Sequence, residues 1–340
     1  LLADLKLNTL AQLNEHLSGS LSGTLSLQGA QYAPDIEANL NAQKGRFDEY
    51  IGNTISLKMH LPRLGQQENN EGAIALNAQG VNIKGVAVDD LQLSAQGTRQ
   101  LHQLQWEAVA GRTRSRGALQ GGFDAASLDW QGSVKSGQFS LPELDWSIVQ
   151  PFEASWKNNQ QQMQLAPHCW QSHEARLCND EQMQIGKTGH LQMHLTGLQA
   201  ERLATFFPDG LLAKGTISGA VEGSWQAGQV PKLNGRLESE NGSLTLGRDT
   251  PQAALVSSYQ HLGLLVEATP EKIDMMLDLI SQELGEGHIE AAIEPTEPSK
   301  PLQGKLTLSN LRLDILQPFF PAISVLSGKL SANGQVAGTL

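Results

Sequence analysis

Long apolar runs, positive charge and charged residues in general are scarce in this 340-residue sequence. No stretch approaches the roughly 18 consecutive apolar residues of a membrane-spanning helix, and the mean hydropathy is −0.28. Lys and Arg number 24 against 35 Asp and Glu, so the formal net charge is −11. That balance argues against the basic footprint of a nucleic-acid-binding protein, and we expect no nucleic-acid partner.

Catalytic motifs are also missing. Gly186-Lys187-Thr188 resembles the end of a phosphate-binding loop, but Glu181 stands where that loop requires its first glycine. His173 and Glu174 begin a zinc-protease motif, but Leu177 occupies its second histidine position. The nine histidines and the acidic residues form no pair that can be positioned. We therefore expect no enzyme, no cofactor and no resident metal.

Period-two alternation of apolar and polar residues dominates what is present. In SLSGTLSLQG, Leu21, Leu25 and Leu27 alternate with serine and threonine, and similar short runs recur along the chain. Such alternation is typical of strands with one buried face. Successive hairpins of this kind build an antiparallel sheet with one wet and one dry face. The alternating positions assigned to the dry face are Leu25, Leu27, Ile74, Leu76, Val81, Ile83, Leu91, Leu93, Leu191, Met193, Leu195, Leu244, Leu246, Leu306 and Leu308.

Local signals refine this interpretation. The pairs Asp89-Asp90, Asn234-Gly235 and Asn241-Gly242 tolerate positive φ and predict tight hairpin turns. The segment 273–280 fits a helix face and a strand face equally well. Glycines at 285 and 287 flank it and favour the strand.

Three short helices are predicted. Residues 9–12 match a capping box and begin a helix with Leu13 and Leu17 on its apolar face. A second helix is expected over about 200–207 and a third over about 314–320, each ended by proline.

These helices precede a repeated unit. Residues 17–29 align without gaps with 326–338, and the FFP motif at 206–208 recurs at 319–321. The unit is a short apolar helix, a glycine-containing turn and a train of strands, and its copies extend one sheet. The predicted modules are 1–197, with a cysteine hairpin, 198–310, and 311–340 as the start of a third.

The order of helix, FFP and glycine–leucine strands resembles the AsmA-like and TamB family of bridge-like lipid transport proteins. The resemblance covers nearly the whole chain, as a central portion of a longer protein. It implies a mostly β fold: an elongated antiparallel sheet curled into one continuous U-shaped groove, a β-taco, with a few short helices. It also implies a periplasmic place in a Gram-negative bacterium, within a parent protein anchored in the inner membrane.

The same resemblance implies a function. The groove would carry phospholipids between the inner and outer membranes and support outer-membrane biogenesis. The dry-face positions would line it, because each exposed CH₂ of an acyl chain costs about 0.8 kcal/mol in water. The implied partners are phospholipid and the outer-membrane barrel TamA, reached through parts of the parent protein outside this sequence. The alternative is a structural β-rich spacer with a closed core that assists outer-membrane protein assembly, since alternation alone fits an open face and a sandwich equally.

Cys169 and Cys178 are the only cysteines in the sequence. The Cys-Trp and Leu-Cys pairs in which they stand resemble the cysteine hairpin of the same family, which implies a disulfide in an oxidising compartment. The alternative is a metal site that adds His168 and His173 as ligands. Zinc sites usually leave a long gap between two ligand pairs, and this segment has none, so we favour the disulfide.

Two further sets of residues leave alternatives open. Arg112, Arg114 and Arg116 alternate along one strand face, which is either a solvated outer face or a headgroup site at the groove rim. Phe206 and Phe207, like their repeat copies, either pack a helix on the sheet or gate the groove.

Overall fold

The computed structural model describes residues 1–340 except 13–15, 31, 48–49, 64–69, 84–85, 208, 247–254, 298, 315–316, 318–322 and 340. The described residues form 23 strands and two short 3₁₀ helices. This confirms the expected mostly β, antiparallel fold class with a few short helices. None of the helices in the described part of the chain is long and apolar enough to cross a membrane.

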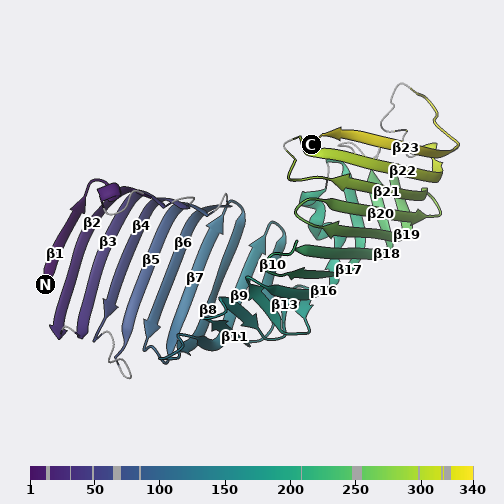
Figure 1. Ribbon diagram of the computed structural model, residues 1–340. Coiled ribbons are helices and arrows are strands. Elements are labelled where there is room, and N and C mark those ends of the chain that lie inside the picture. The colour runs from purple at the N-terminus through teal and green to yellow at the C-terminus, as the bar shows by residue number, and fades with distance from the viewer. Residues whose placement is uncertain are drawn as a thin grey trace. The chain divides into compact units, whose positions relative to one another are not determined.

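Contacts divide the chain into two units, 1–166 and 167–340. In the first unit β1 to β9 pair in chain order (Figure 1). Strand β9 also pairs with β10 and with β11, and β11 pairs with β12. The strands of the first unit are β1 (Leu2–Leu7), β2 (Leu17–Ala30), β3 (Ala33–Phe47), β4 (Tyr50–Leu61), β5 (Gly72–Ile83), β6 (Val86–Gly97), β7 (His102–Ala110), β8 (Thr113–Phe123), β9 (Trp130–Leu141), β10 (Leu144–Ile148), β11 (Phe152–Lys157) and β12 (Gln162–Leu165).

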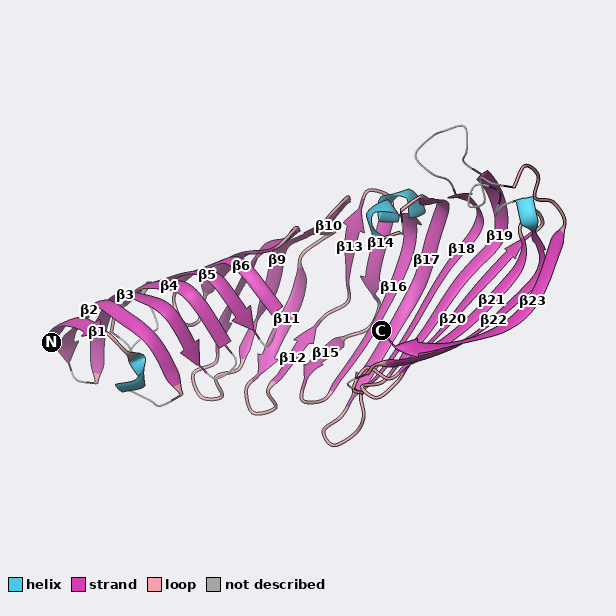
Figure 2. Ribbon diagram, turned by 90° about the horizontal axis from the view of Figure 1, so that it is seen from above, coloured by secondary structure: helices cyan, strands magenta, loops and turns pink. Residues whose placement is uncertain are grey.

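The second unit begins with a short hairpin and continues as long strands. The hairpin β13–β14 joins β16, which also pairs with β15, and β16 to β23 then pair in chain order (Figure 2). Its strands are β13 (His168–Ser172), β14 (Ala175–Asn179), β15 (Met183–Gly186), β16 (Gly189–Gln199), β17 (Leu211–Trp225), β18 (Lys232–Leu246), β19 (Leu255–Ala268), β20 (Ile273–Ser281), β21 (Gly285–Ile293), β22 (Pro301–Arg312) and β23 (Lys329–Thr339). The repeat modules are a different division of the chain, and they stay a prediction.

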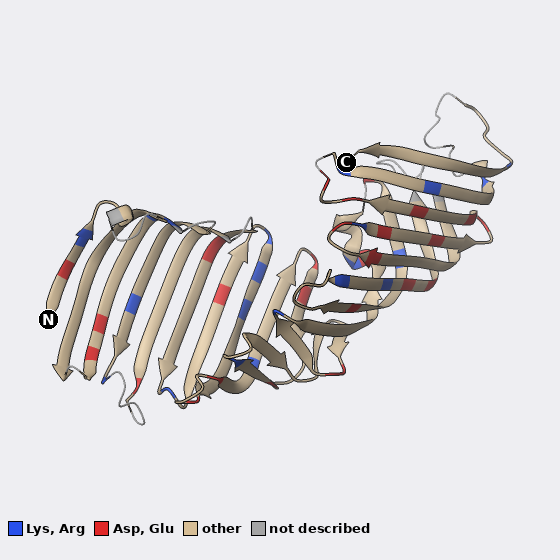
Figure 3. Cartoon of the chain, in the orientation of Figure 1, with Lys and Arg blue, Asp and Glu red and all other residues tan. Residues whose placement is uncertain are grey.

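Strand register gives the first unit one apolar face. Leu57, Leu76, Leu93 and Trp106 are successive direct partners across β4 to β7. Their neighbours point to the other face, where Ser56, Asn77, Gln92 and Glu107 form the matching polar row. Charged residues are thinly spread along these strands (Figure 3). The alternation in the sequence therefore produces two chemically distinct faces, because the strand register pairs apolar residues with apolar ones and polar residues with polar ones.

The second unit repeats this arrangement. A row of direct partners crosses β14 to β22 and consists of Leu177, Leu195, Gly219, Leu237, Leu264, Leu277, Ile289 and Leu306. The residue that follows each leucine points to the opposite face, as Leu265 does after Leu264.

Left-handed residues preserve the apolar face where the alternation changes phase. Gly80 has φ +59° and separates Leu76 from Val81 on β5. Across the sheet, a Cβ at Gly52, the partner of Val81, would lie 2.8 Å from Ile55 Cδ1. Gly52 and Ile55 therefore lie on the same face of β4, although they are three residues apart. Because Val81 is the partner of Gly52, Val81 lies on that apolar face too.

The predicted turns at Asp89-Asp90, Asn234-Gly235 and Asn241-Gly242 are wrong. All three pairs lie inside strands, the first in β6 and the others in β18. Asn241 uses its tolerance of positive φ, +55°, opposite the register shift between Lys214 and Thr216 of β17. The positive φ of Asn241 therefore forms a β-bulge and not a hairpin turn, because the strands paired on both sides of β18 continue the hydrogen-bond ladder past it.

The helix predictions are partly confirmed. Residues Leu10–Gln12 form the 3₁₀ helix η1, but Leu17 begins β2, so it does not continue the helix face. Residues Ala200–Phe206 form η2, as expected. The third predicted helix, and Leu13, lie mostly or wholly outside the described residues. The ambiguous segment 273–280 is strand β20, as the flanking glycines indicated.

Candidate functional site

The apolar face of the second unit is exposed or half-buried along its central row. Leu237 is 38% exposed and Ile289 is 39% exposed, although both lie in the interior of paired strands. The described strands of this unit follow one another in a single series of pairs and place no second sheet over these side chains. An apolar face of this extent in contact with water indicates a binding surface.

The first unit has a similar face. Ile74 is 37% exposed, whereas the alanines Ala38 and Ala78 are buried between larger neighbours. Leu57 and Leu76 stand beside these alanines and are half-buried. The large side chains thus cover the small ones but leave their own outer surfaces open.

The structure brings the predicted dry-face residues together within each unit. They lie on six strands, β2, β5 and β6 of the first unit and β16, β18 and β22 of the second. The direct pairs Leu76–Leu93, Leu195–Gly219 and Leu306–Ile289 join their rows. Ile83 and Leu246 are placed in β5 and β18, and their side chains lie outside the description. Their role as the lining of a lipid groove stays a prediction.

Polar groups that fall on the apolar face are hydrogen-bonded there. The Trp106 indole N–H donates to Ser115 Oγ at 3.2 Å. In the second unit the hydroxyls of Tyr259 and Ser239 lie 2.7 Å apart, and the Tyr259 hydroxyl also donates to the Lys214 carbonyl at 3.2 Å. These bonds remove the cost of unpaired polar groups on a dry surface.

One end of the first unit's apolar face deepens into a pocket of about 590 Å³. Sequence reasoning missed it, because its walls come from eight strands, β4 to β9 together with β11 and β12. The glycines that lie near Trp130 were the sequence signal that could have indicated the pocket. A Cβ at Gly121 would lie 2.6 Å from the Trp130 ring, so the indole lies against the sheet. The apolar wall includes Leu61, Ile74, Leu104, Leu119, Trp130 and Trp156.

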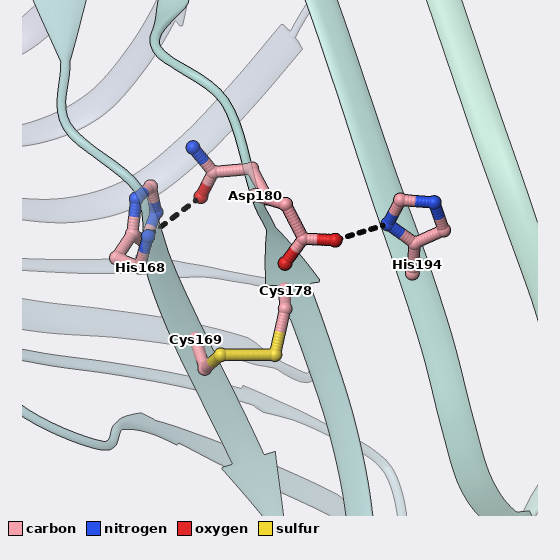
Figure 4. The surroundings of a disulfide bond; sticks show 6 residues. His168, Cys169, Cys178, Asp180 and His194 are labelled. Atoms are coloured by element: carbon pink, nitrogen blue, oxygen red, sulfur yellow. Dashed lines mark hydrogen bonds and ion pairs between the residues drawn. A yellow bond between two sulfur atoms is a disulfide. The ribbon is translucent and has the colours of Figure 1, made fainter.

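The predicted disulfide is confirmed. Cys169 and Cys178 are direct partners on β13 and β14, and their sulfur atoms are bonded (Figure 4). Beside them Asn179 Oδ1 accepts the His168 backbone N–H at 3.1 Å. The zinc interpretation is wrong, since both thiols are consumed, and no group of three His, Cys, Asp or Glu in the described residues is arranged to hold a metal.

The disulfide lies on the polar face. Cys178 is the partner of His194, whose Nδ1 is 3.2 Å from Asp180 Oδ2 (Figure 4). The adjacent pair of Trp170 and Leu177 points to the apolar face and continues into Leu195. The covalent bond therefore fixes the register of the hairpin that starts the apolar row.

The remaining candidate residues lie on the polar face or at strand ends. Arg114 pairs with Glu107 at 3.8 Å and Arg116 donates to Gln138, on the polar face of β8, while Arg112 lies in the preceding turn. These contacts favour the solvated outer face. Phe206 at the end of η2 is 57% exposed and Phe207 is half-buried, and the role of both residues stays a prediction.

One histidine network crosses the polar face of the second unit. His288 Nδ1 lies 2.6 Å from Asp278 Oδ1, and its Nε2 lies 3.1 Å from Glu290 Oε1. The hydrogen bond with Asp278, followed by that with Glu290, raises the pKa of His288 above its usual value. The network links β20 and β21 by charge as well as by the backbone ladder.

Together these features define a class: antiparallel β-sheet modules with one polar face and one exposed apolar face. The chain belongs to the family described as "TamB, N-terminal domain", which matches residues 1–340. It is similar to the translocation and assembly module subunit TamB of Haemophilus influenzae (strain ATCC 51907 / DSM 11121 / KW20 / Rd), with 21% identity over 349 residues that cover 99% of this chain and 25% of that protein. The chain thus spans about a quarter of this relative's length. No solved structure gives a significant match.

Proposed function

We propose that the apolar faces of the two units carry the acyl chains of phospholipid. The observation that supports this most directly is the exposure of Leu237 and Ile289 in the middle of a fully paired sheet. An acyl chain laid along this row would remove apolar surface from water on both partners, at about 25 cal/mol per Å². Headgroups would stay in water at the edge of the face.

The side chains of this row also suit movement along it. Leucine, isoleucine and valine offer no hydrogen bonds, and the tyrosine and tryptophan donors described above are occupied. A lipid tail would therefore find similar contacts at each successive strand, with no polar group that holds it in one place. Transfer would be passive within this part of the protein.

Family membership supports a proposal for the cellular setting. The similar protein from Haemophilus influenzae is a subunit of a translocation and assembly module, so we place this chain in the equivalent module of its own cell. We propose that it lies in the periplasm, in a parent anchored in the inner membrane and partnered with the outer-membrane barrel TamA. The Cys169–Cys178 bond fits that oxidising compartment.

Two substitutions on opposite faces test the proposal. Leu237→Asp places a charge on the apolar face, and Leu265→Asp places one on the polar face at nearly the same exposure, 38% against 36%. Lipid extraction and mass spectrometry of the purified chain should find phospholipid in the wild type and in Leu265→Asp, and much less in Leu237→Asp. Equal lipid content in both folded variants would contradict the proposal, and a lipid-free wild type that takes up no labelled phospholipid would favour a closed spacer.

A further inference from the structure

The pocket in the first unit differs chemically from the rest of the apolar face. It lies where β4, β6 and β8 end and β5, β7 and β9 begin, and it holds about 590 Å³. That volume is within the range of about 300–1,000 Å³ that is usual for small-molecule sites. Phe123, Trp130 and Trp156 give it aromatic walls, whereas the central row of the second unit is aliphatic.

The ring nitrogens of Trp130 and His102 in its wall are paired. The Trp130 indole N–H can only donate, and His102 Nε2 accepts it at 3.0 Å. His102 Nδ1 then carries the hydrogen and donates to the Thr98 carbonyl at 3.1 Å. The ring of His102 also stacks on Phe123, with centroids 5.3 Å apart. The aromatic part of the wall therefore offers an apolar surface with no free hydrogen-bonding group on these two rings.

Arg99 supplies a positive charge at the same pocket. It lines the pocket from the loop between β6 and β7, and its Nε is buried with no hydrogen-bond partner among the described residues. Its charge reaches Asp124, whose pKa is lowered mainly by the Ser127 N–H and only in small part by Arg99. Arg99 is half-buried, and its permanent positive charge at the pocket favours an anionic group beside it, because guanidinium binds carboxylate and phosphate with charge-assisted hydrogen bonds.

We infer that this pocket binds one acyl chain of a single-chain anionic amphiphile, with the chain against Phe123, Trp130 and Trp156 and the anionic group at Arg99. The inference rests on the proposed function, since the ligand would reach the pocket along the apolar face. It adds a place where a chain is held. The pocket would retain free fatty acid or lysophospholipid, in contrast to the aliphatic row of the second unit.

Equilibrium binding of radiolabelled palmitate to the 340-residue chain tests the pocket. Phe123→Asp and Met163→Asp alter two exposed pocket residues, and Phe139→Asp alters a comparably exposed phenylalanine of β9 that does not line the pocket. Palmitate affinity should fall at least roughly tenfold in both pocket variants and stay near wild type in Phe139→Asp. Unchanged affinity in the folded pocket variants would overturn the inference.

Arg99→Gln tests the charge. The wild type should bind palmitate more tightly than its neutral methyl ester, and Arg99→Gln should remove that preference, which we expect to be roughly tenfold. Lysophosphatidylglycerol is assayed in parallel with palmitate. The ligand that loses more affinity in Arg99→Gln shows whether Arg99 binds a phosphate or a carboxylate headgroup. Equal loss for the methyl ester and both acids would overturn the role of Arg99.

The two proposals fail separately. If phospholipid co-purifies with the chain but palmitate binding is unchanged in Phe123→Asp, the pocket inference is wrong and the proposed function is still supported. Palmitate binding that depends on Phe123 and Arg99, in a chain that carries no phospholipid, would sink the proposed function and keep the pocket as a site for free amphiphiles.

Discussion

Trp106 and Gly117 are direct partners on β7 and β8, and the indole of Trp106 covers the glycine. A Cβ built on Gly117 would lie 2.3 Å from two carbons of the Trp106 ring. The hydrogen bond from the indole to Ser115 holds the ring along the apolar face. A large aromatic residue can therefore lie flat on a single-layer sheet only because its partner has no side chain.

Gly117→Ala should destabilise the first unit by about 1–3 kcal/mol, because the ring must shift to admit a methyl group. Gly235→Ala is the matched control in an open position of β18, where nothing lies within 4 Å of the added Cβ. We expect that variant to be neutral or slightly stabilising. Urea unfolding followed by tryptophan fluorescence measures both, and an equal effect at the two glycines would show that Trp106 does not need Gly117.

Loss of the disulfide should loosen the start of the second unit. The bond closes a loop with a sequence separation of 9 residues, which predicts a loss of about 2–3 kcal/mol in the Cys169→Ser, Cys178→Ser double variant. Hydrogen exchange should accelerate in β13 and β14 and change little in β19 to β22. Acceleration spread evenly over the unit would contradict a local role for the bond.

The His288 network predicts a pH dependence with a definite sign. The folded pKa of His288 is raised, so its contribution to stability is complete below the unfolded pKa and is lost as pH rises through the folded value. Unfolding of the second unit in urea should therefore become easier as the pH rises above about 6.5, the usual pKa of histidine. His288→Gln should flatten that dependence, and a wild-type profile that the substitution leaves intact would exclude the network as its source.

The bulge at Asn241 predicts an asymmetry between two small substitutions. Asn241→Ala should cost about 1 kcal/mol, because φ is +55° and alanine disfavours that conformation. Asn241→Gly should be close to neutral, since glycine adopts positive φ freely. Thermal unfolding of the two variants measures the difference, and a more stable alanine variant would show that the bulge is not maintained in solution.

Much of the sheet follows from local sequence. Alternation at Leu76, Leu93 and Leu306 predicts strands and assigns each side chain to one face, because the period of a strand is fixed at two residues. The phase change between Leu76 and Val81 does not disturb that assignment, since Gly80 takes the left-handed conformation that resets the face. The cysteine pair is likewise local, with both partners in one hairpin.

The turns and the pocket do not follow from local sequence. Asn234-Gly235 has the composition of a hairpin turn, yet neighbouring strands on both sides hold it extended inside β18. The pocket needs register between distant strands: His102 and Trp130 are 28 residues apart and meet only when β7, β8 and β9 pair. Pairing of this kind depends on the whole sheet, which a window of sequence does not contain.

The central claim is that acyl chains lie against the apolar face and not the polar one. A photo-crosslinking amino acid placed at Ile289 of β21 or at Met276 of β20 tests it directly, since the two positions are similarly exposed on opposite faces of neighbouring strands. After irradiation in cells, mass spectrometry should find phospholipid attached at position 289 and none at position 276. Equal crosslinking at both positions, or crosslinking at 276 alone, would contradict the account.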